Sequence, residues 1–205
     1  MNFRSFLTFL ALLAAVFLFP VRDANAKDTP RKELKYFMKL PTDEAAQRRF
    51  FTNLELVTQE GRPIRFYDDI LKDKVVLIDF IFTHCEHACP ANSQIFSQVQ
   101  SALADQMEEK LRLVSISVDP KRDTPRALTE FASQFDAGKG WTFLTGKKEN
   151  LDKIIKKLGQ FNQDVEAHSP MFILGNVKTG HWRIVRGNFP PQGLVTLLKL
   201  LLSKK

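Results

Sequence analysis

The sequence contains only two cysteines, Cys85 and Cys89, and three residues separate them. A structural disulfide usually closes a long loop, because the crosslink then constrains the unfolded chain most strongly. A bridge across three residues would constrain almost nothing, so we expect this pair to perform chemistry rather than to hold the fold together. No third cysteine is left over, which argues against a disulfide-linked dimer, and we expect a monomer.

Long basic runs and stacking-aromatic motifs are also absent, although the formal net charge is +7. These absences argue against a nucleic-acid partner, since proteins of that class gather basic residues into patches or stripes. The positive charge instead suits an anionic membrane surface, an acidic face of a partner protein, or simple solubility. Internal repeats and low-complexity segments are absent as well, and the length suits one domain behind a leader.

The longest apolar run, Phe6–Phe19, is shorter than the roughly 20 residues that a membrane-spanning helix needs. Arg4 precedes this run, Pro20 ends it, and Ala24-Asn25-Ala26 supplies a small-x-small cleavage pattern. Together these features predict a signal peptide over residues 1–26, with an uncleaved N-terminal anchor as the alternative. In both cases we expect an extracytoplasmic domain, in the periplasm or at the outer face of the inner membrane.

The segment after the leader, residues 27–53, is polar and charged and is interrupted by Pro30 and Pro41. We interpret it as an N-terminal spacer with one helical stretch over residues 43–51. The folded domain is then expected to span residues 54–205.

The pattern of that domain alternates strands with helices. Val75–Phe82 is almost entirely apolar and is rich in β-branched and aromatic residues, which predicts a central strand buried on both faces. Apolar residues then recur at helical spacing from Ile95 to Met107. Further strands are expected at residues 54–57, 63–66, 112–118, 141–144, 171–174 and 182–185, and further helices at 124–135, 150–158 and 191–202. This order predicts an α/β, thioredoxin-like fold with a mixed, mostly parallel central sheet flanked by helices.

The two cysteines fall where the buried strand ends and the following helix begins. At a spacing of i and i+4 on a helical turn they face the same side, within reach of a disulfide or of one shared ion. The partial positive charge of a helix N-terminus favours the thiolate, so lowered cysteine pKa values are expected. Thiolates are soft ligands that select Cu(I), and an imidazole suits both copper oxidation states.

Three blocks of sequence carry a family resemblance. They are Phe82-Thr83-His84-Cys85-x-x-x-Cys89-Pro90, Ser117-Val118-Asp119-Pro120-x-x-Asp123-Thr124-Pro125, and His168-Ser169. In this order and approximate spacing they resemble the signature blocks of the Sco/SenC copper chaperones, and the resemblance covers roughly Leu54 to Leu202. A Cys-x3-Cys pattern alone is a weak signal, whereas all three blocks together are a specific one.

The resemblance implies a copper site that consists of Cys85, Cys89 and the distant His168. It also implies a metallochaperone that binds Cu(I) and Cu(II) and delivers copper to the CuA centre of cytochrome oxidase. The expected cofactor is therefore copper, and the expected partner is a cytochrome oxidase copper subunit.

The remaining polar candidates have plainer interpretations. We expect His84 to point away from the site, His87 to be exposed although it could reach the ion, and His181 to lie at the surface of a hairpin. Asp119 and Asp123 suit turn formation and helix capping. A structural zinc site is not expected, because a second pair of cysteine or histidine ligands is missing.

Some residues depart from the family pattern and favour an alternative. Glu86 and His87 stand where the family usually has Pro and Asp, which leaves the ligand set intact. Asp79 and Pro170 resemble the buried acid and the cis-proline of thioredoxins, although a partly solvated carboxylate and an ordinary trans proline would also explain them. The alternative function is an extracytoplasmic thiol-disulfide oxidoreductase that uses the Cys85/Cys89 pair, with Cys85 as the attacking thiol. A peroxiredoxin is disfavoured, since its Thr stands three residues before the reactive cysteine and Thr83 stands two before Cys85.

Overall fold

The computed structural model describes residues 37–86, 88–159, 171–186 and 189–204. In this part of the chain, eight strands form one sheet in the order β1-β8-β7-β4-β5-β6-β2-β3. The elements in chain order are β1 (Phe37–Lys39), α1 (Glu44–Phe51), β2 (Glu55–Thr58), β3 (Pro63–Arg65), a π-helical turn (Phe66–Leu71), β4 (Val75–Ile81), α2 (Ala88–Ala102), a 3-10 turn (Ala104–Gln106), β5 (Leu111–Ser117), α3 (Pro125–Ser133), β6 (Trp141–Thr145), α4 (Lys148–Lys157), β7 (Met171–Asn176), β8 (His181–Arg186) and α5 (Pro191–Leu202).

Strand β4 lies at the centre of the sheet, and all seven of its residues are buried, as the apolar run predicted. It pairs in parallel with β5, which in turn pairs in parallel with β6. The sheet is therefore mixed, as expected, but it is not mostly parallel, because these two pairings are parallel and the other five among the described strands are antiparallel. The outer ladders are antiparallel, because strands such as β7 and β8 are joined by short turns, whereas parallel strands need a long crossover.

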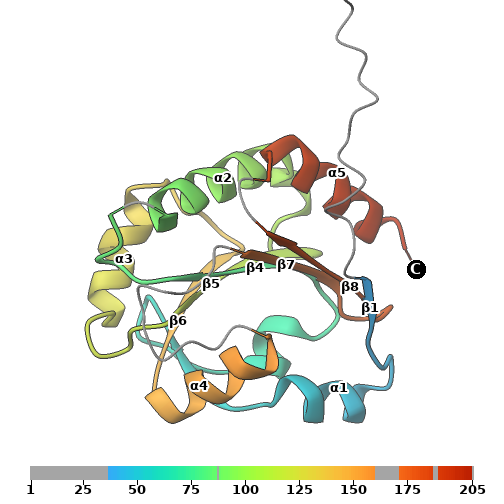
Figure 1. Cartoon of the computed structure of the whole chain (residues 1–205), viewed down its shortest axis with the longest axis horizontal. Helices are drawn as coiled ribbons and strands as arrows, with labels where there is room; N and C mark the ends of the chain where they lie inside the picture. Colours follow the sequence, from blue (N-terminus) through green and yellow to red (C-terminus); the bar gives the residue numbers. More distant parts are fainter. Residues whose placement is uncertain (1–36, 87, 160–170, 187–188, 205) are drawn as a thin grey trace, which may run out of the picture. The chain divides into compact units, whose positions relative to one another are not determined.

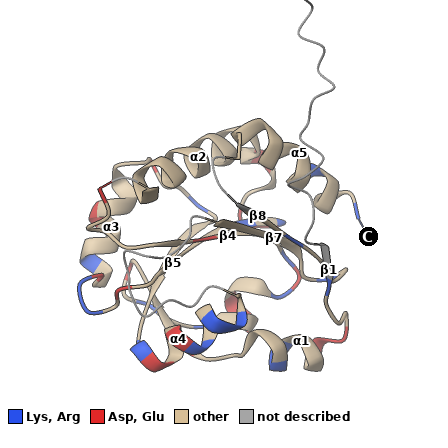
Figure 2. Cartoon of the chain, in the orientation of Figure 1, with Lys and Arg blue, Asp and Glu red and all other residues tan. Residues whose placement is uncertain are grey.

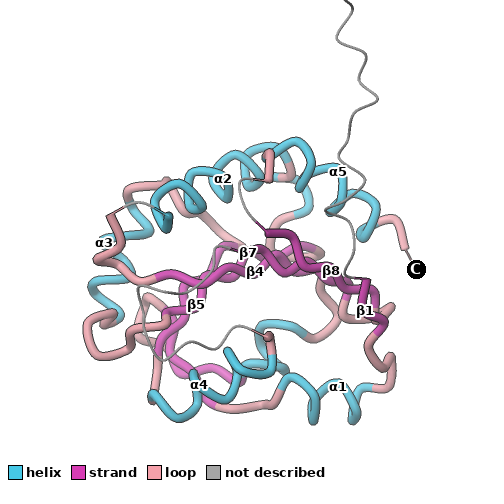
Figure 3. The backbone as a smooth tube through the Cα atoms, viewed as in Figure 1, coloured by secondary structure: helices cyan, strands magenta, loops and turns pink. Residues whose placement is uncertain are grey.

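Helices cover both faces of the sheet (Figure 1). Helices α2, α3 and α5 pack on one face, and α1, α4 and the π-helical turn pack on the other. The side chains of β4 alternate between the two layers, so that Leu77 and Ile81 face α2 and α5 while Ile78 and Phe80 face the opposite core. The tube in Figure 3 shows the sheet between these two helical layers.

The segment N-terminal to Leu54 differs from its expected role as a spacer. Strand β1 pairs with β8, and α1 places Phe51 in the core at 1% exposure. The helix predicted over residues 43–51 is confirmed, and Asp43 caps it by accepting a hydrogen bond from the backbone N–H of Ala46 at 2.7 Å. The folded unit therefore begins before Leu54.

Gln47 shows why the polar composition of this segment was misleading. Its side chain is buried, donates to the Val177 carbonyl at 2.5 Å and accepts from the Tyr67 hydroxyl at 2.8 Å. A buried polar group with its hydrogen bonds made is compatible with a core, so polarity alone did not distinguish this helix from a spacer.

Gly175 of β7 makes room for a large side chain on the neighbouring strand β8. It lies opposite Trp182 in the antiparallel β7–β8 pair, and a Cβ atom at this position would overlap the buried indole ring. The absence of a side chain at residue 175 therefore makes room for one of the largest buried side chains.

The signal peptide expected over residues 1–26 lies outside the described residues. Within the described ranges, no helix has the length and apolar character needed to cross a membrane. The buried apolar residues of the described chain lie between Phe51 and Leu201, so a protein that starts at Lys27 keeps this core.

Candidate metal centre

The cysteine loop follows the buried end of β4 and leads into α2. Phe82 is buried at this point, and its carbonyl accepts a hydrogen bond from the backbone N–H of Cys85 at 3.1 Å. Cys89 lies in the first turn of α2, which begins at Ala88. The predicted location of the pair, between a buried strand and a helix N-terminus, is confirmed.

The two cysteines are neighbours that differ in exposure. The backbone N–H of Cys89 donates to the sulfur of Cys85 at 3.3 Å, so this sulfur lies at the N-terminus of α2. Cys85 is half-buried, whereas Cys89 is 0% exposed. One thiol is therefore accessible from outside while the other lies beneath it.

Burial disfavours ionisation of Cys89, the deeper of the two thiols. Desolvation raises the pKa of Cys89 far above its ordinary value, and the neighbouring Cys85 adds to the effect. The expectation of a lowered pKa is therefore wrong for Cys89, because loss of hydration outweighs the helix dipole. A soft metal ion that binds Cys89 must displace a proton from it.

Asp123 anchors the cysteine loop by accepting hydrogen bonds from Thr83. Its side chain is 0% exposed, and its Oδ1 atom accepts hydrogen bonds from the backbone N–H of Thr83 at 3.0 Å and from the Thr83 hydroxyl at 2.7 Å. Its Oδ2 atom accepts from the buried Ser117 hydroxyl at 2.5 Å. The second sequence block is thus joined directly to the residue that stands two positions before Cys85.

The capping role expected of Asp123 is wrong, because Thr124 caps α3 by accepting from the Ala127 N–H at 3.2 Å. Asp119 does form the predicted turn, since its carbonyl accepts from the N–H groups of Arg122 and Asp123. Its carboxylate also pairs with Arg122. Sequence reasoning therefore missed the positioning role of Asp123, although its place inside a signature block was a usable signal.

Asp79 is fully buried in β4, on the face that also packs against Cys89. Neither carboxyl oxygen is in hydrogen-bonding geometry with a described residue. Desolvation raises the pKa of Asp79 to about 7, and the Ser115 hydroxyl opposite it on β5 offsets part of the rise. The interpretation of Asp79 as a partly solvated carboxylate is therefore wrong, and the thioredoxin-like interpretation agrees with its burial.

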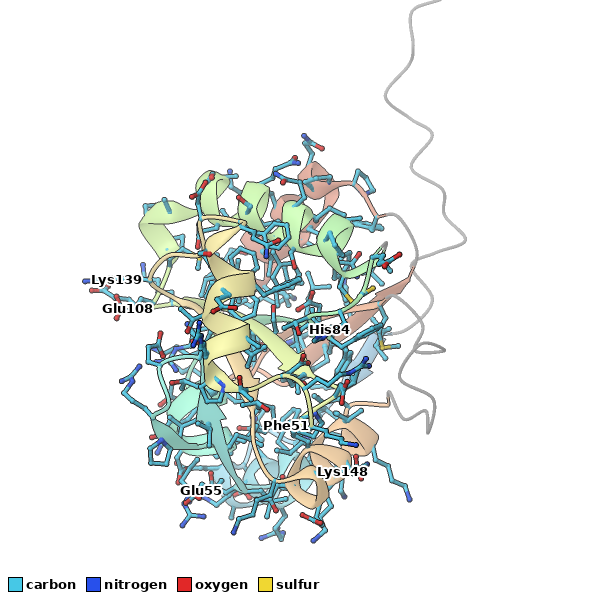
Figure 4. All side chains as sticks on the ribbon, turned by 90° about the vertical axis from the view of Figure 1, so that its left-hand side faces the viewer. Phe51, Glu55, His84, Glu108, Lys139 and Lys148 are labelled. Atoms are coloured by element: carbon cyan, nitrogen blue, oxygen red, sulfur yellow. The ribbon has the colours of Figure 1, made fainter. Side chains whose placement is uncertain are left out.

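Of the four histidines in the sequence, the structure describes His84 and His181. His84 is exposed in the cysteine loop, where its Nδ1 atom lies 3.1 Å from the Thr83 hydroxyl (Figure 4). His181 is half-buried at the start of β8, so its expected surface position holds only in part. His87, His168 and Pro170 lie outside the described residues. Among residues that the structure describes, no cluster of three His, Cys, Asp or Glu side chains could hold a metal ion.

The chemistry of the two described thiols, those of Cys85 and Cys89, nevertheless fits copper. Two thiols that lie one helical turn apart supply two soft ligands, and the helix N-terminus favours negative charge on the Cys85 sulfur. A hard ion such as Mg²⁺ would find no carboxylate group gathered here in the described chain.

Comparison with known families decides the relationship. A model of the SCO1/SenC family matches residues 42–198. The chain belongs to the SCO1/SenC family. The match begins within the N-terminal segment that the structure places in the fold.

Three relatives illustrate the family. The SCO1 protein homolog of Bacillus subtilis is 36% identical over 93 residues, which are 45% of this chain and 47% of the relative. The copper-bound ScoI structure of Bradyrhizobium japonicum superposes with a TM-score of 0.59 at 27% identity, covering 72% of this chain and 96% of the other. BsSco superposes with a TM-score of 0.62 at 26% identity, covering 74% and 92%. It is described as a member of the Sco family of cytochrome c oxidase assembly proteins with a disulfide switch.

The aligned part of this chain spans about half the length of the first curated relatives it matches. The structural matches cover nearly all of the other chains and confirm the predicted thioredoxin-like α/β fold.

Proposed function

We propose that this SCO1/SenC protein is a copper metallochaperone that binds Cu(I) and Cu(II) through Cys85, Cys89 and His168. The observation that carries the proposal is the contact between the Cys89 N–H and the Cys85 sulfur, which holds two soft donors one helical turn apart. The copper is cargo, and its acceptor is the CuA centre of a cytochrome oxidase copper subunit.

Strand register supports His168 as the third ligand. Ile173 of β7 lies opposite Ile78 of β4, so the start of β7 lies at the same end of the sheet as the end of β4. His168 precedes Met171, the first residue of β7, by three positions, and three residues span at most about 11 Å. The proposed ligand therefore belongs to a segment of the sequence that leads into the sheet end that carries the cysteines.

Cys85 and Cys89 have different roles in copper transfer. Half-buried Cys85 is the first donor that incoming copper meets, and the acceptor's ligands approach from the same side. Cys89 loses its proton when copper binds, which makes metal binding favour higher pH. Asp123 keeps the preceding Thr83 in place, so that the loop does not have to be ordered when copper arrives.

Copper in the ScoI structure and the oxidase-assembly description of BsSco support this cargo and this acceptor. The signal-peptide pattern over residues 1–26 supports an extracytoplasmic site, in the periplasm or at the outer face of the inner membrane. The monomeric state stays a prediction.

The test is a titration of the reduced protein lacking residues 1–26 with Cu(I) and with Cu(II). We expect one tight equivalent for the wild type, loss of both ions in Cys85→Ser, and selective loss of Cu(II) in His168→Ala. His84→Ala is the matched control, because His84 lies in the same loop and is exposed. Tight binding that is indifferent to His168 would contradict the proposed ligand set.

A thiol-disulfide oxidoreductase is the second candidate, and the buried Asp79 favours it. In this reaction the Cys85 thiolate attacks a substrate disulfide, breaks its S–S bond, releases the first substrate thiolate and forms a mixed disulfide with the other sulfur. The Cys89 thiolate, whose proton passes to the Asp79 carboxylate, then releases the second substrate thiol and leaves the pair oxidised. Asp79→Asn should therefore slow exchange while copper affinity stays nearly unchanged, and equal exchange rates would exclude this role for Asp79.

A further inference from the structure

The last part of the chain has an unusual charge distribution. From Ala167 to Lys205 the sequence contains six basic residues and no Asp or Glu. Strands β7 and β8 and helix α5 come from this stretch, and α5 carries a blue segment but no red one in Figure 2. These three elements are therefore built without acidic side chains.

The basic residues in the last turn of α5 and just beyond its end are not neutralised by described neighbours. Lys199 and Lys204 are exposed, and neither forms an ion pair with a described residue. On α4, by contrast, Lys148 pairs with Asp152 at 2.7 Å. The positive field of α5 thus remains available to an external anionic surface.

Apolar surface lies beside these lysines. Leu200 is 52% exposed and is the one exposed large apolar residue among those that the structure describes. A small groove between α5 and β8 adjoins it, lined by Leu197, Leu201, Trp182, Arg183 and Lys204. Leucine flanked by basic side chains on a helix is the arrangement of elements that lie at a membrane interface.

We propose that the C-terminal half of α5 and the adjoining part of β8 dock on the surface of an anionic lipid bilayer. We name this surface the α5–β8 face and define it by Arg183, Leu197, Lys199, Leu200 and Lys204. The uniform positive charge matches anionic headgroups, and the exposed leucine reaches the boundary of the acyl chains.

The path of the N-terminal chain supports a membrane as the occupant. Strand β1 pairs with β8 beside this face, with Phe37 opposite Arg183 and Lys39 opposite His181. The 36 residues that precede β1 include the apolar run Phe6–Phe19. In the sequence, the most hydrophobic segment therefore precedes a strand that pairs with β8 of the α5–β8 face.

Docking in this way would orient the copper site. The Asn176 side chain donates to the Leu201 carbonyl at 2.9 Å, and Asn176 lies opposite Val75, the first residue of β4. The cysteine loop follows the other end of β4, roughly 20 Å away for a strand of this length. The bound protein would present Cys85 away from the bilayer, toward an acceptor domain that projects from the membrane.

The test measures cosedimentation of the protein lacking residues 1–26 with vesicles of equal parts phosphatidylcholine and phosphatidylglycerol, with phosphatidylcholine vesicles for comparison. Each exposed lysine contributes about fivefold to partitioning onto an anionic surface, so Lys199→Gln with Lys204→Gln should weaken binding about 30-fold. The matched control is Lys153→Gln with Lys156→Gln, which removes the same charge from exposed positions on α4, across the sheet.

We expect the α4 variant to bind within about threefold of the wild type, since its lysines lie far from the docked face. Leu200→Gln should weaken binding about fivefold without loss of thermal stability, because the residue is exposed. Equal losses in the two lysine variants would show a net-charge effect and overturn the proposal. Failure of the wild type to bind anionic vesicles would also overturn the proposal. If oxidase assembly in cells still required Lys199 and Lys204 in that case, the face would belong to a protein partner.

Discussion

Removal of the Asp123 carboxylate is the sharpest test of how the cysteine loop is held. In Asp123→Ala, the Thr83 N–H and the Ser117 hydroxyl lose their acceptor, and so does the Thr83 hydroxyl. Hydrogen bonds to a charged group contribute about 1.5–3 kcal/mol each. Thr83 is only half-buried, so water can replace the bond to its hydroxyl. The other two bonds predict a loss of about 3–6 kcal/mol in the free energy of unfolding.

Urea unfolding of the metal-free, reduced protein measures this loss. Asp123→Asn should retain about half of the stabilisation, because its carbonyl still accepts from Thr83 while its amide can donate to the Ser117 oxygen. Asp105→Ala removes an exposed carboxylate from the 3-10 turn and should change the stability by less than about 0.5 kcal/mol. An Asp123→Ala protein within about 1 kcal/mol of the wild type would refute the view that this carboxylate anchors the loop.

Two further predictions concern the buried sheet. The folded protein keeps the Asp79 proton up to about pH 7, whereas the unfolded chain releases it near pH 4, so the free energy of unfolding should fall by up to about 4 kcal/mol over that interval. Asp79→Asn cannot ionise, and urea unfolding at about pH 5 and pH 8 should show that it removes this fall. Gly175→Ala should cost about 2–3 kcal/mol, because the new methyl group overlaps the buried ring of Trp182.

Each of these two predictions has an outcome that would contradict it, and the glycine substitution also has a control variant. A wild-type protein with equal stability at the two pH values would show that Asp79 is ionised throughout. Gly138→Ala is the control for Gly175→Ala, since a Cβ at residue 138 would meet only ordinary contacts with Gln100, from 3.5 Å. If the two alanine variants unfold at the same urea concentration, the close approach of Trp182 does not constrain residue 175.

Much of the fold follows from local patterns in the sequence. Val75–Ile81 is buried on both faces, so its apolar run was itself sufficient evidence of a central strand. Strand β1 has three residues and shows no periodicity, so it becomes a strand only by pairing with β8. Strand β1 and the packing of α1 into the fold were missed for this reason, because their evidence is long-range pairing and burial.

The features of the candidate site also fall into those that local sequence determines and those that depend on the tertiary structure. The sequence by itself determined the cysteine pair at the junction of β4 and α2, because a strand end, a helix start and an i, i+4 spacing are local properties. Only the tertiary structure decided that Cys89 is buried with a raised pKa and that Asp123 holds Thr83 from 40 residues away. Burial and long-range hydrogen bonds depend on which segments pack together, and local spacing in a sequence does not contain that information.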